Sequence, residues 1–237
     1  MRLTRQSLQR IRHRHFGYRI TLLTQMALLL LLPVSQHQPW VLSLMLCLLA
    51  LVLMVFLSRY SVLQRTRPLV YGLGGLALGL ELLWHVALVR SPAMAAGLTF
   101  PHVLVWVLFL ILSTVRKVRT LIREPFVTVS VVLGAASGYF TLGIAGGLLL
   151  TALWVLDPAG FQLAVLPPVA AGHSPVLTAG PALMAASFGL LTTVGTAVLS
   201  PASVTAQVMA TVITVAGQLY VAILIALILS RVHRRLL

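Results

Sequence analysis

The stretch that decides the fold runs from Thr178 to Pro201 and reads TAGPALMAASFGLLTTVGTAVLSP. Its apolar part, 179–191, is too short to cross a bilayer, because a spanning helix needs about 20 apolar residues. Proline is tolerated in the first turn of a helix, so we expect a short helix that begins at Pro181 and ends near Thr192. Irregular backbone follows, and at membrane depth such backbone is tolerated only where it lines a cavity or is buried in protein. The stretch therefore predicts a re-entrant loop.

The rest of the chain has the composition of a protein that crosses a membrane several times. Of its 237 residues, 59% are hydrophobic and only 8% are charged, whereas a soluble domain has about 25% charged residues. We therefore expect an all-α polytopic membrane protein with six transmembrane helices. The six apolar segments that approach the required length are 17–34, 40–57, 69–89, 100–115, 126–156 and 203–230.

The charges are distributed very unevenly along the chain. There are 17 Lys and Arg residues against three acids, Glu81, Glu124 and Asp157. All the cations except Arg90 lie in the N-terminal tail, the C-terminus or the loops that would share their side of the membrane. Cytoplasmic loops collect Lys and Arg, so we expect a multi-pass protein of the cell membrane with both termini cytoplasmic. The basic tail would contact anionic inner-leaflet lipids, and we expect no nucleic-acid partner.

Beyond the short helix, the chain resembles the pore of potassium channels. Residues 192–195, Thr-Thr-Val-Gly, resemble the start of the filter sequence T-T-V-G-Y-G-D. Pro181 precedes Gly195 by 14 residues, which is the pore-helix spacing of simple bacterial potassium channels. Gly217 follows Pro201 by 16 residues, where that family has the hinge glycine of its inner helix. The resemblance covers 126–232 and includes the flanking segments Ser187-Phe188 and Gly217-Gln218-Leu219-Tyr220.

This resemblance implies a homotetramer that conducts a monovalent cation, potassium or sodium, between four loops around one axis. The Thr193 hydroxyl and carbonyl would form the innermost site, and a pore helix and filter loop would lie between helices five and six. The implied domains are a basic cytoplasmic tail (1–19), a four-helix membrane domain resembling a charge-poor voltage-sensor domain (20–115), a cytoplasmic linker (116–125) and a pore domain (126–237). The implied filter residues are Thr192, Thr193, Val194, Gly195, Thr196 and Ala197, and Gly217 is the implied hinge.

The outer half of this filter departs from the family, because Thr196-Ala197-Val198 stands where the family has Tyr-Gly-Asp. Ala197 is unfavourable there, since left-handed backbone costs a non-glycine residue roughly 1–2 kcal/mol. We therefore expect a cation channel with weak or altered potassium selectivity. One alternative is a non-conducting or accessory subunit that co-assembles with another channel subunit. Another is a small secondary transporter, which would require broken helices in both halves of the chain.

Glu81 is the acid that falls well inside an expected span, and His85 lies one turn further on the same helical face. Such a pair is either a proton-sensing site or a polar pair that satisfies another helix, and the second interpretation is preferred. The segment 100–115 carries no charge, which disfavours conventional voltage gating. The other histidines lack the spacing of metal ligands. We expect that the protein is not an enzyme and that it binds no cofactor and no metal ion beyond the permeant cation.

Overall fold

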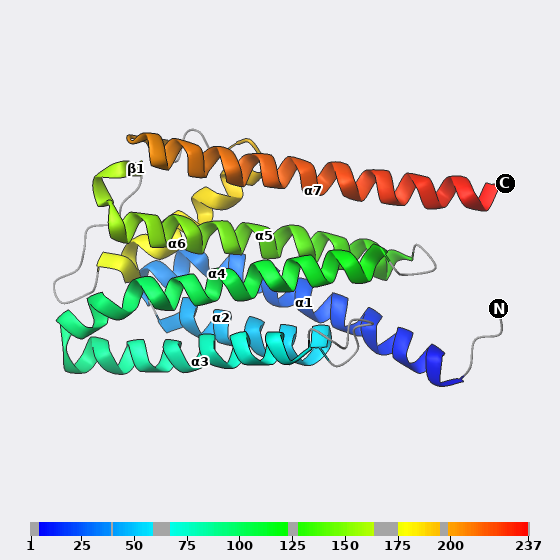
Figure 1. Ribbon diagram of the computed structural model, residues 1–237, viewed down its shortest axis with the longest axis horizontal. Coiled ribbons are helices and arrows are strands. Elements are labelled where there is room, and N and C mark those ends of the chain that lie inside the picture. The colour runs from blue at the N-terminus through cyan, green and yellow to red at the C-terminus, as the bar shows by residue number, and fades with distance from the viewer. Residues whose placement is uncertain are drawn as a thin grey trace.

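The computed structural model describes residues 5–38, 40–58, 67–122, 128–163, 175–194 and 199–236. Within them the chain is all-α, as predicted, apart from one two-stranded sheet and a 3-10 turn (Figure 1). The helices are α1 (Arg5–His37), α2 (Trp40–Val52) with a π-helical extension (Leu53–Ser58), α3 (Arg67–Arg90), α4 (Pro92–Ile122), α5 (Val129–Leu156), α6 (Pro175–Leu191) and α7 (Val204–Leu236). Strands β1 (Phe161–Leu163) and β2 (Leu199–Pro201) are antiparallel, and the 3-10 turn is Pro158–Gly160.

Five of these helices, α1, α3, α4, α5 and α7, are long and apolar enough to cross a membrane. The length and composition of these helices are therefore consistent with a protein that crosses a membrane several times. The second expected span, 40–57, is a shorter apolar helix, Trp40–Phe56, and the segment Ala179–Leu191 within α6 is shorter still. Large apolar side chains are exposed along α1, α3, α4 and α7, as expected of surfaces that face lipid, whereas α5 is mostly buried.

Several boundaries differ from the sequence-based expectation, among them the start of α4, which begins at Pro92 rather than near residue 100. Helix α1 begins at Arg5, inside the segment expected to be a basic tail. Helix α4 continues to Ile122, because apolar residues such as Leu121 keep its buried face packed beyond 115. Helix α6 begins at Pro175, so Pro175 rather than Pro181 occupies the first turn, and Pro181 lies inside the helix.

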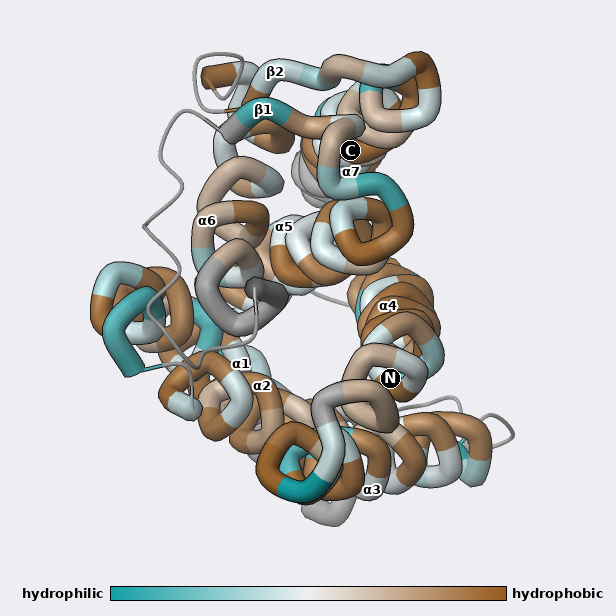
Figure 2. Tube along the Cα trace, turned by 90° about the vertical axis from the view of Figure 1, so that its left-hand side faces the viewer, coloured by the Kyte–Doolittle hydropathy of each residue, from teal (hydrophilic) through white to brown (hydrophobic). Residues whose placement is uncertain are grey.

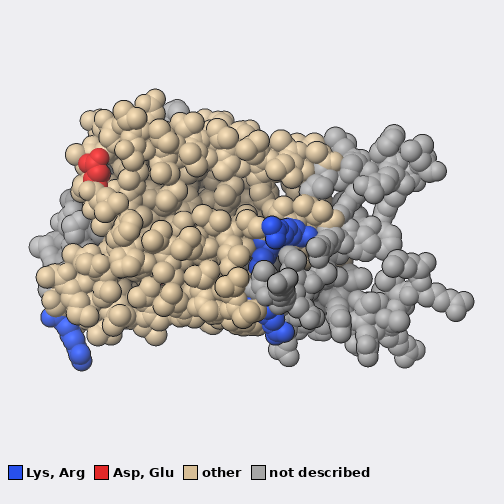
Figure 3. Space-filling view, viewed as in Figure 1, with Lys and Arg blue, Asp and Glu red and all other residues tan. Residues whose placement is uncertain are grey.

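The helices form two groups that lie side by side. Figure 2 shows α5, α6, α7 and the sheet together, with α1, α2 and α3 on the other side of the molecule and α4 beside α5. Helix α1 begins and α7 ends at the same end of the molecule (Figure 1). Most of the described Lys and Arg side chains visible in Figure 3 gather towards that end. The fold therefore keeps the charge asymmetry that the sequence shows.

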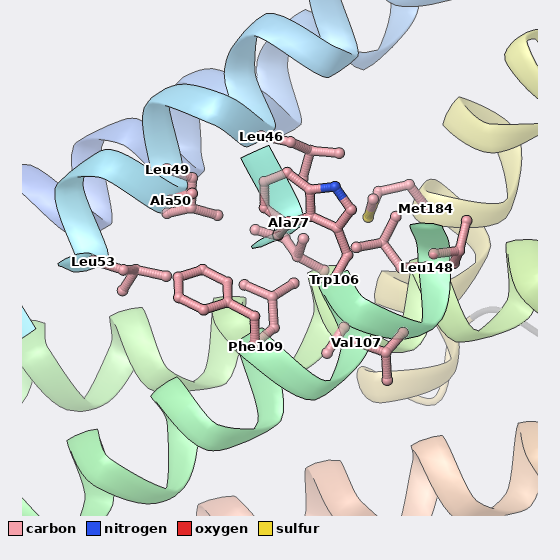
Figure 4. Packing of buried hydrophobic residues seen from close by; sticks show 14 of the residues in the cluster. Leu46, Leu49, Ala50, Leu53, Ala77, Trp106, Val107, Phe109, Leu148 and Met184 are labelled. Carbon is pink, nitrogen blue, oxygen red and sulfur yellow. The ribbon is translucent and has the colours of Figure 1, made fainter. Parts of the chain in front are cut away.

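The main hydrophobic core joins the two groups, as Figure 4 shows around Trp106 and Phe109 of α4. The Trp106 ring lies beside Leu148 of α5 and Met184 of α6, whereas the Phe109 ring lies next to Leu53 of the π-helical extension. Lipid tails are as apolar as leucine, so in a bilayer this core stabilises the fold mainly through van der Waals packing. Trp106 and Phe109 are both fully buried, so the packing of their rings fixes how α4 lies against its neighbouring helices.

Candidate functional site: the end of α6 and the face of α7

Helix α6 lies unusually close to α5, because glycines of α5 line the contact. A Cβ atom on Gly146 would meet the Ser187 hydroxyl, and one on Gly147 would meet Met184. The hydroxyl of Ser187 donates a hydrogen bond of 2.8 Å to the carbonyl of Gly143. Small residues allow such close approach between membrane helices. The glycines of α5 therefore hold α6 inside the helix group rather than at its surface.

Helix α6 ends at a buried residue that lies well away from the start of α7. Its last residue, Leu191, packs against Gly217 of α7, and its carbonyl accepts a hydrogen bond from Tyr139 of α5. Gly217 lies 13 residues after the start of α7 at Val204, which at 1.5 Å per residue is about 20 Å along the helix. Strands β1 and β2 instead pair next to the start of α7, where the amide of Ala202 donates to the carbonyl of Gly160.

The turn that ends α6 is a Schellman motif with threonine in the glycine position. The amide of Val194 donates to the carbonyl of Gly189, and the amide of Thr193 donates to the carbonyl of Leu190. Thr193 has φ 62°, in the left-handed region. For a β-branched residue this conformation is a genuine outlier, and such strain clusters at functional sites.

Three of the expected filter residues lie at this turn, and the side chains of Thr192, Thr193 and Val194 are all exposed. The Thr193 hydroxyl donates to the carbonyl of Thr192 at 2.6 Å. The other expected filter residues, Gly195, Thr196 and Ala197, lie outside the described residues, as does Val198. The expected hinge, Gly217, lies within the continuous helix α7 and contacts Leu191.

A polar stripe runs along α7, and we define it as Gln207, Thr211, Thr214 and Gln218. At about 100° per residue these four positions, spaced by 4, 3 and 4, fall within about 60° of one another. All except the half-buried Thr214 are exposed. The neighbouring exposed arc is apolar and consists of Val204, Val208, Val212, Val215 and Leu219. Sequence analysis missed the stripe, although its spacing could have revealed it.

The polar stripe lies next to the α6-facing side of α7. Going around the helix, Tyr220 and Ile213 come first and face Gly138 and Gly146 of α5. Gly217, which faces α6, comes next, then the polar stripe, and then the apolar arc. The stripe therefore flanks the contact with α6 and has no helix of this chain packed over it within the described residues.

The expected polar pair, Glu81 and His85, lies at a second polar cluster. The Glu81 carboxylate is buried and accepts hydrogen bonds from His102 Nε2 at 2.6 Å and from the Trp106 indole at 2.8 Å. His85 is more distant, with Nδ1 3.7 Å from Glu81 Oε1. The ring of His102 stacks on Trp84 at 5.2 Å. His102 and Trp106 were not predicted, although both lie one turn apart on a single face of α4.

This Glu81 cluster borders a cavity of about 50 Å³ between the two helix groups. Thr151 of α5 and Met184 of α6 line its far side. The carboxylate is satisfied by neighbouring helices, which is what the preferred sequence interpretation expects of a structural pair. The described residues contain no group of three or more His, Cys, Asp or Glu side chains that could hold a metal ion.

Lys117 lies in a third polar cluster, which is buried, and not in the cytoplasmic linker where it was expected. Lys117 is 2% exposed, and its Nζ donates to the Ser137 hydroxyl of α5 at 2.7 Å. Ser137 donates to Gln25 Oε1 at 2.9 Å, and Gln25 Nε2 donates to Thr141 at 2.7 Å. The expectation failed because α4 continues past 115 and its buried face carries this lysine against α5.

No family model, curated protein or solved structure matches the chain.

Proposed function

We propose that the protein is a pore-forming subunit of a tetrameric, potassium-channel-like membrane channel. Monovalent cations, potassium or sodium, would pass the turn at Thr193 and the residues that follow it. In this proposal α6 is the pore helix, α7 is the inner helix, and the α2 segment completes six crossings with α1, α3, α4, α5 and α7. Because Thr196-Ala197-Val198 replaces Tyr-Gly-Asp, the channel would have weak or altered potassium selectivity.

The observation that carries the proposal is the polar stripe on α7. In a bilayer, polar side chains need a polar partner or water, because lipid tails offer neither. The exposed glutamines of the stripe, Gln207 and Gln218, lie beside an exposed apolar arc, whereas the Thr211 hydroxyl already donates to the carbonyl of Gln207. An assembly in which α7 faces neighbouring subunits and a water-filled axis offers the two glutamine amides polar partners or water, whereas lipid does not.

The course of α6 supports the same proposal. The helix is too short to span, and it ends about 20 Å along α7 from the helix start, judged by its rise per residue. The flanking strands β1 and β2 meet beside the start of α7. This is the arrangement expected of a chain that enters and leaves on one side of the membrane. In this proposal the exposed residues Thr192 and Thr193 would lie at membrane depth, where an exposed turn favours an aqueous path.

The long helices of the N-terminal half disfavour a secondary transporter, which would need broken helices in both halves. Helices α3 and α4 run through 24 and 31 residues. An accessory subunit remains the second candidate, because the altered sequence at Thr196-Ala197-Val198 is where a complete filter would have its outer sites. A flux measurement separates the pore-forming subunit from the accessory subunit.

Purified protein in liposomes provides the test. We expect a tetramer by native mass spectrometry and potassium and sodium efflux above that of empty liposomes. The two ions should differ by less than about a hundredfold, equivalent to about 2.7 kcal/mol. Thr193→Ala should reduce the flux. Thr205→Ala should not, because Thr205 is an exposed threonine of α7 on the side opposite the polar stripe.

A monomer without flux would contradict the proposal. Flux that arises only after co-expression with a subunit bearing a complete filter would favour the accessory role. A potassium preference well above a hundredfold would contradict the altered selectivity alone.

A further inference from the structure

Tyr139 reaches from α5 to the end of α6. Its hydroxyl donates a hydrogen bond of 2.9 Å to the carbonyl of Leu191, the last residue of α6. Its ring lies against the ring of Tyr220 of α7, with centroids 6.1 Å apart. Tyr139 therefore meets both helices at the level where Leu191 packs against Gly217.

The carbonyl groups at the end of a helix lack partners in the helix, so their hydrogen bonds must be accounted for. From Phe188 to Thr192 there are five such carbonyls. Those of Phe188, Gly189 and Leu190 accept the amides of the Schellman turn, and that of Thr192 accepts the Thr193 hydroxyl. Among the residues that the structure describes, the carbonyl of Leu191 accepts only the Tyr139 hydroxyl. Within the described residues, Tyr139 makes the one hydrogen bond from another helix to these five carbonyls.

This hydrogen bond lies beside the strained residue of the turn. Thr193, with φ 62°, follows Leu191 by two residues. A strained conformation persists only when the surrounding structure fixes it. The Schellman hydrogen bonds fix the turn internally, and the Tyr139 hydroxyl fixes its depth and orientation relative to α5.

We propose that Tyr139 is a positioning residue for ion selectivity, which holds the inner end of the filter through the Leu191 carbonyl. The inference rests on the proposed function, since it concerns the same turn. Selectivity requires coordinating oxygens at defined separations, and in a tetramer four Tyr139 hydroxyls would fix four copies of Thr193. Tyr139 itself does not touch the ion. Its loss lets the turn shift and makes the inner site less discriminating.

The chain provides a matched control in Tyr220. Its hydroxyl also donates to a backbone carbonyl of α5, that of Ala135, at 2.7 Å, but within the described part of the chain it makes no hydrogen bond to α6. Tyr139→Phe and Tyr220→Phe therefore remove the same kind of hydrogen bond from neighbouring places. Only the first of these bonds reaches the filter turn.

The experiment compares wild type, Tyr139→Phe and Tyr220→Phe as tetramers in liposomes, with efflux of potassium, rubidium and sodium as the readout. Tyr139→Phe should change the potassium-to-sodium ratio by about threefold to tenfold, the equivalent of one hydrogen bond. Tyr220→Phe should stay within about twofold of wild type. A second readout is the rise in melting temperature when potassium replaces N-methylglucamine, which should be smaller for Tyr139→Phe only.

Equal ratios and equal potassium-dependent shifts in the two variants would overturn the role of Tyr139 and leave the channel proposal intact. A wild-type protein with neither flux nor a potassium-dependent shift would refute the channel itself, and this inference with it. If Tyr139→Phe does not assemble, Tyr139→4-aminophenylalanine takes its place, because its amino group occupies the position of the hydroxyl and can donate to the same carbonyl. Wild-type selectivity of this variant supports the proposal, and an altered ratio contradicts it.

Discussion

In the N-terminal helices and α5, two buried polar clusters pair their side chains across helices, whereas along α7 an exposed polar stripe points away from the other helices. Glu81 meets His102 and Trp106, and Lys117 meets Ser137, all in buried surroundings. The exposed members of the polar stripe and the threonines that end α6 have no such cover. Both regions lie in a chain that is 59% hydrophobic.

This contrast separates two uses of polarity inside a membrane protein. A polar group that is fully paired fixes how helices pack, because breaking the pair leaves a donor or acceptor without water. A polar group that faces outward without a partner in its own helix needs water or a polar group of another subunit. The first kind should therefore govern stability, and the second kind should govern assembly and ion passage.

The largest effect is expected at Glu81. Glu81→Ala removes the acceptor that His102 and Trp106 share and leaves a buried donor of this pair unpaired, which should cost about 3–5 kcal/mol of unfolding free energy. Thermal or SDS unfolding followed by tryptophan fluorescence measures this loss. Glu81→Gln keeps an acceptor oxygen and should cost less than half as much. Equal losses in the two variants would show that the hydrogen bonds do not stabilise the fold.

A smaller effect is expected at the Lys117 cluster, which also tests what kind of group matters. Ser137→Ala removes the oxygen that accepts from Lys117 and donates to Gln25, so it should cost about 1–3 kcal/mol. Lys117→Met has similar volume and leaves no buried donor behind, so it should be nearly neutral or stabilising. The same unfolding assay applies. A larger loss in Lys117→Met than in Ser137→Ala would contradict the assignment.

At Thr193, stability and function should change in opposite directions. Thr193→Gly removes the left-handed strain, which should stabilise the turn by about 1 kcal/mol. The same change deletes the hydroxyl and should reduce cation flux at least about tenfold, or roughly 1.4 kcal/mol. Thr193→Ser keeps the hydroxyl and is the matched control for flux. Full flux in the glycine variant would remove the Thr193 hydroxyl from the ion path.

The smallest change in stability is expected along the polar stripe. Thr211→Val and Gln218→Leu replace exposed side chains and should alter the unfolding free energy by less than about 0.5 kcal/mol. They should nevertheless reduce the tetramer fraction or the flux, which native mass spectrometry and liposome efflux can report. Thr205→Val, on the opposite side of α7, should change neither. If all three variants behave alike, the stripe has no role in assembly.

The parts of the fold that depend only on the length and composition of one helix were predictable. Long apolar segments predict the long helices because length and composition suffice for that inference, and α5 ends at Leu156 as expected. The start of α6 was predicted six residues too late, because Pro175 and Pro181 are both acceptable near a helix start. The end of α4 was placed too early, because its charged residues were taken as a sign of solvent.

The candidate site was predictable only in part. The motif around Thr193 located the turn, but the hydroxyl of Tyr139 reaches it from a residue 52 positions from Leu191. His102 likewise lies 21 positions from Glu81. No spacing rule connects such residues, because the register between two packed helices depends on both surfaces at once.

By itself, the sequence determined that this is an all-α chain with long apolar helices, a strong charge asymmetry and a short helix ending at Thr192-Thr193. These properties follow from composition and local backbone preference, which act within a few turns of the chain. The tertiary structure alone decided which polar groups are covered. It buries Lys117 against Ser137, pairs Glu81 with His102 and leaves the polar stripe of α7 open, because burial depends on what neighbouring helices cover.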